Sequence, residues 1–394
     1  MAKVRMGVIG AGNMGGHHAK YMNQVPGAEL AALADTDGEK RKKLAEQYPG
    51  VAIFDTATAL LDSKKVDAIL IATPHYDHVP IALAAFERGI HVLSEKPMAV
   101  SIKAARQVAE AYTQKYTHLK FGIMFQQRTS AMYQKLRELV VEGELGEINR
   151  VTWIITNWFR TWAYYASGGW RATWKGEGGG VLINQCPHNL DLIQFVVGGM
   201  MPKRVTAVGF IGKTHPIEVE DDISAIFEYE NGAVGHFITT TGEAPGTNRL
   251  EICGDQGKIV AENGKLVFHR LRKNARTIRE QSPESFPKVE AWPIEIPFQG
   301  GGDVHKMVTD QFVQAILNNT PNEKLYAPGT EGVKGLEIGN AMLMSGIIRK
   351  PVELPMSGDA FDAFIDECAK KYGGKKKLET KSSGADMGAS FAKA

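Results

Sequence analysis

The residues with the clearest chemical potential form a glycine-rich turn near the start of the chain. Gly10, Gly12 and Gly15 follow a short β-rich run, residues 4–9, and open a predicted helix. Gly10 permits the tight turn, Gly12 lets a pyrophosphate approach the backbone, and Gly15 lets the helix pack close to the strand. A lone GxGxxG is weak evidence, but a strand before it and a helix after it supply the context that dinucleotide binding requires.

The helix predicted over 13–25 presents its first turn, with Asn13 and Met14, to the phosphates of a dinucleotide. Free N–H groups and the positive end of the helix dipole favour anions at this place. Asp35 ends the next predicted strand, 29–35, 20 residues after the last glycine of the motif. A carboxylate there can accept both ribose hydroxyls of NAD and would repel the 2′-phosphate of NADP. We therefore predict NAD as the cofactor, in preference to NADP.

Two further segments follow predicted strands of the same sheet, at 66–72 and 90–93. They lie at the carboxyl edge of the sheet, where cofactors bind. The residues of these segments that we predict to contact the cofactor are Thr73, Pro74, His75, His78, Glu95 and Lys96. A lysine at a strand end beside a nicotinamide can hydrogen-bond a reacting hydroxyl and relay its proton. Either histidine could instead be only a helix-start residue, and the X-Pro bond after Lys96 could be cis.

A second group of chemically capable residues lies on one predicted amphipathic helix, 179–198. Apolar residues recur on it at spacings of three and four, namely Leu182, Cys186, Leu190, Ile193 and Val197. Asn184, His188 and Asp191 recur on another side and share a face. A histidine bracketed by an amide and a carboxylate has its ring oriented and its tautomer set, as a general acid or base requires. Without the upstream dinucleotide signal, His188 would be interpreted as a structural histidine.

Residues 153–174 are dense in aromatic side chains, and five of the chain's six tryptophans lie there. Trp and Tyr faces stack on the C–H surfaces of sugars, and Arg160 and Arg171 are interleaved with them. We interpret the loop part of this stretch as a lid or pocket wall, with Trp162 and Arg171 as substrate contacts. The glycine run at 176–180 would let the lid move. The alternative is that these side chains serve core packing and subunit contact. Part of the cluster, such as Trp153 on its predicted strand, must do so.

Asp303 and His305 open a further predicted helix, after the glycine run 300–302. Asp303 is most simply the N-cap of that helix. His305 is a candidate substrate contact if its side chain points into the pocket.

The elements that must position these residues fall into two halves. Strand and helix alternate from residue 4 to residue 124, which predicts a parallel sheet with right-handed crossovers. Beyond residue 146, alternating runs appear at 148–157, 203–211, 223–229, 233–241 and 248–253. Asn231-Gly232 lies between two of them as a hairpin signal. The predicted fold class is α/β plus α+β: an N-terminal Rossmann doubly wound parallel sheet, then an open, mostly antiparallel β-sheet with helices on one face.

We predict three regions along the chain. A Rossmann NAD-binding domain spans 1–125, and an α+β domain for substrate binding and oligomerisation spans 126–372. The helix predicted over 303–318 is expected to pack back on the Rossmann domain. Residues 373–394 are rich in Lys, Ser, Gly and Ala and are predicted to be a flexible tail or an arm on a partner subunit.

Composition bounds the classes of partner. The 394 residues are 43% hydrophobic and 23% charged, with a formal net charge of +2, which gives no reason to expect a nucleic-acid partner. Three cysteines lie far apart, which indicates neither a disulfide framework nor a metal site and suits a reducing compartment. The N-terminus enters a strand at once, and no apolar run reaches the ~20 residues needed to span a bilayer. We expect a cytoplasmic protein with no membrane partner and no bound metal. An open sheet face needs covering, which predicts a homodimer or homotetramer.

Several of these motifs together resemble one enzyme family. The GxGxMG at 10–15, the acidic residue at 35, Ala72-Thr73-Pro74 and Glu95-Lys96-Pro97 are similar to the glucose–fructose oxidoreductase, inositol dehydrogenase and rhizopine-catabolism family (Gfo/Idh/MocA). The resemblance continues through 178–184 and 188–191. It implies oxidation or reduction of one carbon of a sugar, cyclitol or related polyol. It also implies that Lys96 and His188 are catalytic, and that the sheet face forms the substrate pocket and often an oligomer interface.

Two positions depart from the family pattern. Members often carry Asp where this chain has Asn184, so the division of proton transfer between Lys96 and His188 stays open. Asn184 can still bind a substrate hydroxyl, and we keep it among the catalytic candidates. The chain also has Gln126-Gln127-Arg128 where many members show an Asn-Arg pair. Gln126 and Arg128 are candidate substrate contacts with a weaker basis.

The leading hypothesis is a reversible hydride transfer between nicotinamide and a secondary hydroxyl of a sugar, glycoside or cyclitol. Two alternatives stay open. Some relatives keep NAD bound and use transient oxidation to cleave a glycosidic bond. A non-catalytic dinucleotide sensor is the third possibility, although a pure sensor needs neither Lys96 nor His188.

Overall fold

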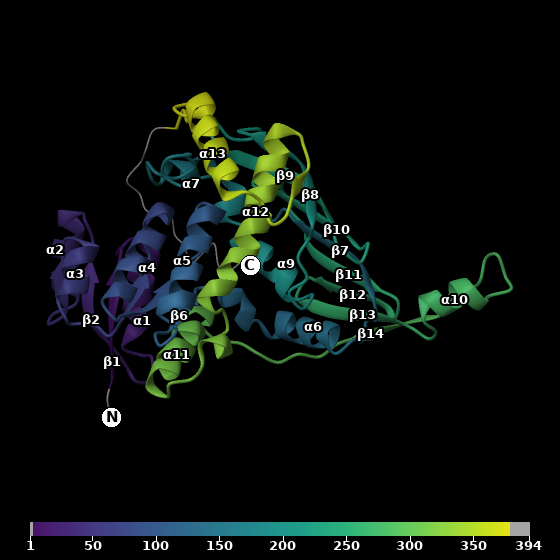
Figure 1. Cartoon of the computed structure of the whole chain (residues 1–394), viewed down its shortest axis with the longest axis horizontal. Coiled ribbons are helices and arrows are strands. Elements are labelled where there is room, and N and C mark those ends of the chain that lie inside the picture. Colours follow the sequence, from purple (N-terminus) through teal and green to yellow (C-terminus); the bar gives the residue numbers. More distant parts are fainter. Residues whose placement is uncertain (1–2, 379–394) are drawn as a thin grey trace.

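Two β-sheets organise the molecule, whose computed structural model describes residues 3–378 (Figure 1). The first sheet has six parallel strands in the order β3-β2-β1-β4-β5-β6. Its strands are β1 Val4–Ile9, β2 Ala28–Ala34, β3 Ala52–Phe54, β4 Ala68–Ile71, β5 His91–Ser94 and β6 Phe121–Ile123. The strand order reverses at β1, as in a doubly wound dinucleotide-binding sheet. The predicted Rossmann fold is confirmed.

Helices cover both faces of this sheet, which is why its central strand β4 is apolar and buried at every position. They are α1 Asn13–Met22, α2 Gly38–Gln47, α3 Ala57–Asp62, α4 His78–Glu87 and α5 Ile102–Lys115. Asp37, Thr56 and Ser101 cap α2, α3 and α5 by accepting hydrogen bonds from backbone N–H groups of the first turn. The unit β3–α3 was not predicted, because β3 has only three residues.

The second sheet has nine strands in the order β14-β13-β12-β11-β7-β10-β9-β8-β15. They are β7 Ile148–Ile155, β8 Arg204–Ile211, β9 Glu220–Glu228, β10 Val234–Thr240, β11 Asn248–Gly254, β12 Gly257–Glu262, β13 Lys265–Leu271, β14 Ala291–Glu295 and β15 Val352–Glu353. β7 and β10 pair in parallel, and the other paired strands are antiparallel. Gly232, with φ of 82°, closes the hairpin between β9 and β10. The predicted open, mostly antiparallel sheet is confirmed.

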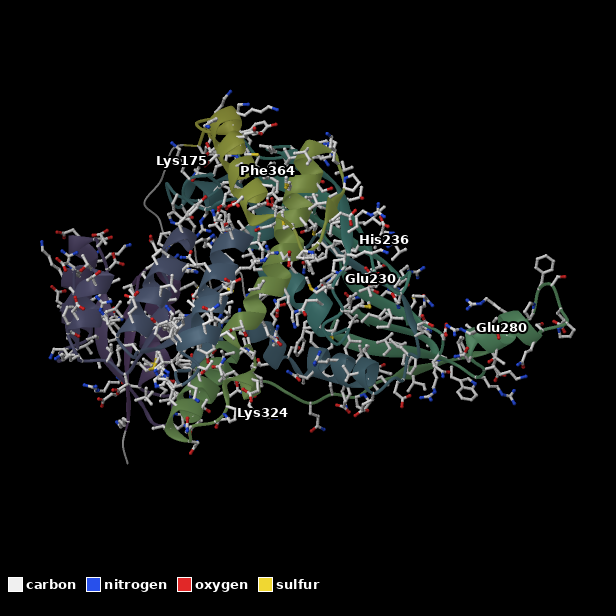
Figure 2. The ribbon with its side chains drawn as sticks, viewed as in Figure 1. Lys175, Glu230, His236, Glu280, Lys324 and Phe364 are labelled. Carbon is white, nitrogen blue, oxygen red and sulfur yellow. The ribbon has the colours of Figure 1, made fainter. Side chains whose placement is uncertain are left out.

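The helices of the second half include α12, which lies against β8, α9 and α5 (Figure 1). They are α6 Ala131–Val141, α7 Trp162–Ala166, α8 Val181–Asn184, α9 Pro187–Phe195, α11 Val304–Leu317, α12 Gly332–Ile348 and α13 Gly358–Tyr372. The opposite face of the sheet is open, and Figure 2 shows His236 of β10 on that outer side. A projecting arm carries α10 Ala275–Gln281, with Glu280 near its end.

The helix α11 returns to the Rossmann domain and packs against α1. Tyr21 Oη lies 2.9 Å from Thr309 Oγ1, and Gln314 Nε2 donates to Pro26 O at 2.9 Å. The side chain of Asp303 accepts from His305 N and Lys306 N and caps α11, as the sequence predicts.

The predicted single helix 179–198 is wrong. The chain forms two helices, α8 and α9, which are separated at Gln185 and Cys186. Pro187 stands at the first position of α9, where its missing N–H costs nothing, whereas inside a helix it would remove a hydrogen bond and clash with the preceding turn. The spacing that placed Asn184 and His188 on one helical face therefore does not hold across the break.

Residues 373–378, at the start of the predicted tail, contact the second domain. Gly374 N donates to Glu218 Oε2 at 2.7 Å, and Lys376 Nζ donates to the carbonyls of Gly168 and Arg171 at 3.0 and 2.8 Å. The remainder of the predicted tail, 379–394, lies outside the described residues. Among residues 3–378, no helix has both the length and the apolar character needed to cross a membrane.

Candidate active site

The glycine loop after β1 has the shape that a dinucleotide requires. Gly10 has φ of 87°, and a Cβ placed on it would lie 2.7 Å from Ala72 O. A Cβ on Gly15 would lie 1.8 Å from Gly10 O, so α1 can approach β1 only because this residue is glycine. A Cβ on Gly12 would meet no described atom within 4 Å, which leaves room for a ligand against the backbone. The three glycines thus fit a bound pyrophosphate.

Asp35 lies beside this loop at the end of β2. Its Oδ2 accepts from Ala11 N and its Oδ1 from Asp37 N, both at 2.9 Å. Within residues 3–378, no side chain caps the start of α1 at Gly12, so its first N–H groups are not occupied by a capping side chain. A carboxylate for the ribose and a helix start for the phosphates therefore lie together, and the residues fit NAD.

Glu95 is buried at the end of β5 and is ion-paired with His18 of α1. His18 Nε2 lies 2.7 Å from Glu95 Oε1, and His18 Nδ1 lies 2.5 Å from the hydroxyl of Tyr21. Burial alone would raise the pKa of Glu95, but the hydrogen bond and charge of His18 lower it to about 2. This pair joins α1 to the segment that follows β5. Lys96 is the next residue of that segment, so the pair helps to fix its position.

His305 stands edge-on to two histidines of α1, His17 and His18, with ring centroids 5.4 and 5.8 Å away. It is 4% exposed. Ligand atoms of His17, Asp303 and His305 lie within 4.8 Å of one another, a spacing compatible with a metal ion. Asp303 already accepts two backbone hydrogen bonds as the cap of α11. His305 thus lies on the Rossmann side of the site.

Lys96 and the two predicted histidines occupy the loops that follow β5 and β4. Lys96 is half-buried, precedes a cis bond to Pro97, and donates from Nζ to Asn184 O at 2.8 Å. Burial lowers the pKa of its ammonium group. His75 Nδ1 lies 2.9 Å from the backbone oxygen of Glu177, which places His75 at the contact between the domains.

His78 lies inside the Rossmann edge and joins its two loops. Its ring nitrogens are 2.9 Å from Thr73 O and 2.8 Å from Pro97 O. The residue is 1% exposed, so it holds the loops in place from within.

His188 lies near the start of α9, and the residue is 5% exposed. The ring of Phe125 contacts it edge-on at 6.0 Å between centroids. Burial, aided by the charge of Lys96, holds the pKa of His188 well below its usual value. Its Nδ1 has no hydrogen-bond partner among residues 3–378. The predicted bracketing by an amide and a carboxylate is wrong, because Asp191 binds a different residue.

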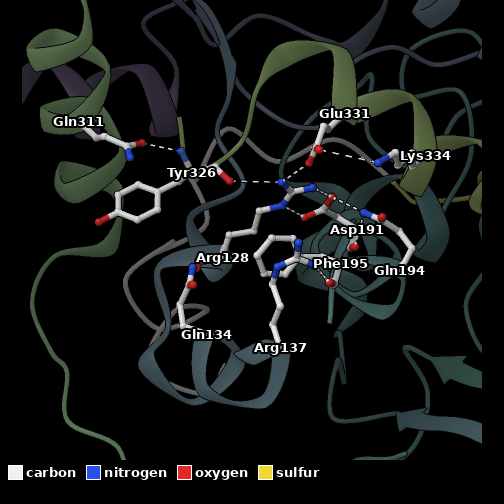
Figure 3. A network of polar contacts seen from close by, with 10 residues as sticks. All are labelled: Arg128, Gln134, Arg137, Asp191, Gln194, Phe195, Gln311, Tyr326, Glu331 and Lys334. Atoms are coloured by element: carbon white, nitrogen blue, oxygen red, sulfur yellow. Dashed lines mark hydrogen bonds and ion pairs between the residues drawn. The ribbon is translucent and has the colours of Figure 1, made fainter. Parts of the chain in front are cut away.

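That residue is Arg128, which was expected to contact substrate and is instead a buried structural arginine (Figure 3). Arg128 is 1% exposed, and its Nε and Nη2 donate to the two oxygens of Asp191, both at 2.6 Å. Its Nη1 donates to Glu331 Oε2 at 2.5 Å and to Tyr326 O at 3.2 Å. The ring of Phe195 packs against the guanidinium at 4.5 Å. Each nitrogen of the group is engaged, so none faces a substrate.

Gln126, the neighbouring candidate, has a different environment. It is 6% exposed, and its Oε1 has no hydrogen-bond partner in the described part of the chain. A buried amide oxygen without a partner is costly, so this position suits a ligand that donates to it.

Asn184, at the end of α8, is held on three sides. Its backbone oxygen accepts from Lys96, its Nδ2 donates to Glu177 Oε1, and its Oδ1 lies 3.4 Å from Tyr164 Oη. Arg171 Nη1 donates to the same tyrosine hydroxyl at 2.8 Å. The side chain of Asn184 is therefore engaged with the protein.

The aromatic stretch divides into a buried part and an exposed part. Trp153 and Trp174 are fully buried, which agrees with core packing, whereas Trp162 is 59% exposed on α7. The loop is fixed at several points, since Trp174 N donates to Glu218 Oε1 at 3.1 Å and Lys376 contacts two of its carbonyls.

Three residues of this site were not among the predicted ones: Glu177, Tyr164 and His18. Glu177 stood inside a glycine run that was interpreted only as a hinge. A single carboxylate flanked by glycines was the available signal, but its partner Asn184 is seven residues away, across a loop whose path the sequence does not indicate.

Comparison with family models gives two adjoining matches. Residues 4–122 match the oxidoreductase family with an NAD-binding Rossmann fold, and residues 133–260 match the GFO/IDH/MocA C-terminal domain. The two matches fall on the two sheets.

Named relatives resemble most of the chain. An inositol 2-dehydrogenase of Arthrobacter sp. (strain FB24) is 30% identical over 233 residues, which cover 59% of this chain but only 65% of that relative. A D-glucoside 3-dehydrogenase of Escherichia coli (strain K12) is 30% identical over 322 residues, 74% of this chain and 90% of the relative. The crystal structure of the WlbA dehydrogenase from Bordetella pertussis, in complex with NADH and UDP-GlcNAcA, has the same fold: the TM-score is 0.74 at 24% identity, over 90% of this chain and 100% of the other.

Proposed function

Since this chain belongs to the Gfo/Idh/MocA family of oxidoreductases, we propose that it transfers a hydride between NAD and a secondary hydroxyl, or the matching ketone, of a sugar, glycoside or cyclitol. Relatives named for an inositol and for a D-glucoside support a polyhydroxylated ring as the substrate class. The observation that carries the proposal is the 2.8 Å hydrogen bond from Lys96 Nζ to Asn184 O. It brings the strand-end lysine of the NAD-binding domain to the segment that leads into His188.

NAD, when bound, supplies the hydride-accepting position of the nicotinamide. The chain positions the substrate and handles its proton. Because burial lowers the pKa of Lys96, its neutral amine is accessible as the acceptor of the hydroxyl proton. Because the pKa of His188 is held low, its ring is neutral at pH 7 and offers a hydrogen bond to the same oxygen without a second positive charge.

Further substrate contacts follow from position and exposure. His188 Nδ1 and Gln126 Oε1 lack partners among residues 3–378, which supports both as ligand-facing groups. Trp162 offers an exposed indole face for a sugar ring. Arg171 holds Tyr164 beside Asn184, and we include it in the wall of the substrate site.

Turnover assays test the proposal directly. Protein mixed with NAD and a panel of sugars, glycosides and cyclitols should produce the absorbance of reduced nicotinamide. Lys96→Ala should lower turnover by ~100-fold or more while NAD binding persists, because a positioned proton acceptor is lost. Lys115→Ala, an exposed position in the last turn of α5, serves as the control and should have no effect. Absence of net NAD reduction with every substrate, or an unchanged rate in Lys96→Ala, would contradict the proposal.

We further propose that NAD is preferred over NADP and that the protein works in the cytoplasm. The carboxylate of Asp35 beside the glycine loop supports the cofactor preference. Cys186, Cys253 and Cys368 are free and buried, which suits a reducing compartment.

A second copy of this chain is the proposed cover for the open face of the nine-stranded sheet. Exposed apolar side chains gather there on three neighbouring strands: Val208, Phe210, Ile226, Val234 and Ile238. An apolar sheet face of this kind is typical of a subunit interface, and closed symmetry would give a dimer or tetramer. Sedimentation should give the mass of two or four chains, and a monomer would contradict this assignment.

A further inference from the structure

One buried carboxylate beside the site takes part in none of the steps above. Glu177 is 1% exposed. Its Oε2 accepts from Ala172 N at 2.5 Å, its Oε1 accepts from Asn184 Nδ2, and Arg171 Nη1 lies 3.8 Å away. Removing a carboxylate from water costs free energy unless hydrogen bonds and opposite charge compensate. The burial of Glu177 beside the site therefore calls for a functional explanation.

Asn184 links this acid to the candidate catalytic lysine. Lys96 Nζ donates to the backbone oxygen of Asn184, and the side-chain amide of the same residue donates to Glu177. Tyr164 Oη lies 3.4 Å from the remaining side-chain oxygen. An amide neither gains nor loses a proton at ordinary pH. Glu177 is therefore the acid of this chain of contacts; burial raises its pKa, whereas Arg171, Ala172 N, Asn184 and Lys96 lower it and favour the carboxylate.

We propose that Glu177 is a positioning residue whose carboxylate fixes Asn184 and acts, together with Glu95, as a buried counter-charge of Lys96. This inference rests on the proposed function. When the alcohol is oxidised, its C–H bond breaks and the hydride goes to NAD. The O–H proton goes to the amine of Lys96, and a carbonyl is left. Lys96 thereby gains a positive charge away from water, and the fixed negative charge of Glu177 stabilises it.

The charged groups that act on Lys96 pull its pKa in both directions. Burial lowers the pKa of Lys96 most, Glu95 and Glu177 raise it, and Arg171 and Arg160 lower it. The pKa of Lys96 therefore stays below its usual value, and the two carboxylates limit how far it falls. Removing either carboxylate would shift this balance toward the neutral amine.

Of the two carboxylates that raise the pKa of Lys96, Glu95 has the larger effect and Glu177 adds to it. Burial holds the pKa values of His75 and His188 well below the usual histidine value, so both rings are neutral at pH 7. Glu95 is engaged by His18 at 2.7 Å. Arg171 Nη1 lies 3.8 Å from Glu177 Oε1.

The variant Glu177→Gln removes the charge and keeps the shape of the side chain. The pKa of Lys96 should fall by about 1 pH unit or more, the usual effect of losing a close opposite charge. NMR titration of ¹³C-methylated lysines in the free protein measures it, with Lys96→Arg identifying the signal. In alcohol oxidation, the acid limb of the kcat/KM profile should move to lower pH by the same amount, and the plateau kcat should fall roughly tenfold.

Two matched variants separate charge from loop structure. Glu177→Asp keeps the charge and should keep the pKa of Lys96 near that of the wild type. Glu218→Gln removes a buried carboxylate of the β8–β9 connection, one that accepts from Trp174 N of the same loop as Glu177 and from Gly374 N, and should leave the pKa of Lys96 unchanged. If Glu177→Gln does not fold, Lys96→Met gives the reciprocal measurement, because the pKa of Glu177 should then rise.

The NMR measurement does not depend on catalysis, so it separates the two proposals. Turnover with a sugar but no change of the Lys96 pKa in folded Glu177→Gln, or of the Glu177 pKa in Lys96→Met, overturns the inference. A falling Lys96 pKa in a protein that reduces NAD with no substrate overturns the proposed function and supports the coupling of the two side chains.

Discussion

The two halves of the site are built by different means. The cofactor half is built mainly of backbone: three glycines shape its loop, and the side chain that joins them is the strand-end carboxylate of Asp35, all within residues 10–35. The substrate half is made of side chains, in which Lys96, Asn184, Glu177 and Tyr164 come from separate segments and hold one another by hydrogen bonds. A local motif fixes the first, whereas only the folded chain assembles the second. Disruption of a single backbone position should therefore have its largest effect in the cofactor half.

Gly15→Ala tests the backbone-built half and has the largest expected effect on cofactor affinity. Its Cβ would lie 1.8 Å from Gly10 O, so either the loop or α1 must move away. NAD affinity should fall by about 100-fold or more, which corresponds to about 2.7 kcal/mol. Titration calorimetry with NAD measures this change.

Gly16→Ala is the matched control one residue along the same helix. A Cβ there would meet no described atom within 4 Å. Affinity should be unchanged, and the helix should gain about 1 kcal/mol from the better helix former. Equal affinities of the two variants would show that the loop is not the phosphate site.

The local character of the first half explains why it could be predicted. The predicted strand 4–9 coincides with β1, because its end is marked by the glycine that makes the turn. In the second half, the spacing of the apolar residues predicted one continuous helix. Pro187 cannot stand inside a helix without breaking it, so a second helix begins there. Because Asn184 and His188 lie on different helices, the predicted shared face does not exist. Long-range partners such as Arg128 and Asp191 are 63 residues apart and leave no spacing signal.

The second test concerns the buried ion pair between Arg128 and Asp191, which supports the helix that carries His188. Arg128→Met leaves the carboxylate of Asp191 buried without its bidentate partner. Breaking such a pair should lower the free energy of unfolding by about 3–5 kcal/mol. Denaturant unfolding measures the loss, and NAD affinity of the folded fraction should stay near that of the wild type.

Two further variants give this experiment its controls. Arg128→Met combined with Asp191→Leu removes both charges and should recover much of the lost stability, since an apolar pair of similar volume replaces the ion pair. Arg270→Ala, at an exposed ion pair with Glu144, should change stability by no more than about 0.5 kcal/mol. A fully stable Arg128→Met with a raised KM would instead return Arg128 to the substrate contacts.

The smallest expected effect belongs to Asp35, because the change is confined to one edge of the cofactor site. Asp35→Ser removes the charge that opposes a 2′-phosphate and leaves two neighbouring cations, Lys40 and Arg41. Lys40 Nζ already lies 3.9 Å from Asp35 Oδ2, and Arg41 Nη1 donates to the backbone oxygen of Asp35 at 2.8 Å. The ratio of NAD to NADP affinity should fall by about tenfold or more, equivalent to about 1.4 kcal/mol.

Asp35→Asn separates the two contributions of this carboxylate. The amide keeps one acceptor for Ala11 N or the ribose but carries no charge. If repulsion of the phosphate sets the preference, Asn and Ser should relax it equally. If the ribose hydrogen bonds set it, Asn should retain more NAD affinity than Ser while NADP affinity changes little. A ratio unchanged in both variants would remove Asp35 from cofactor selection and leave the glycine loop as the whole of the backbone-built half.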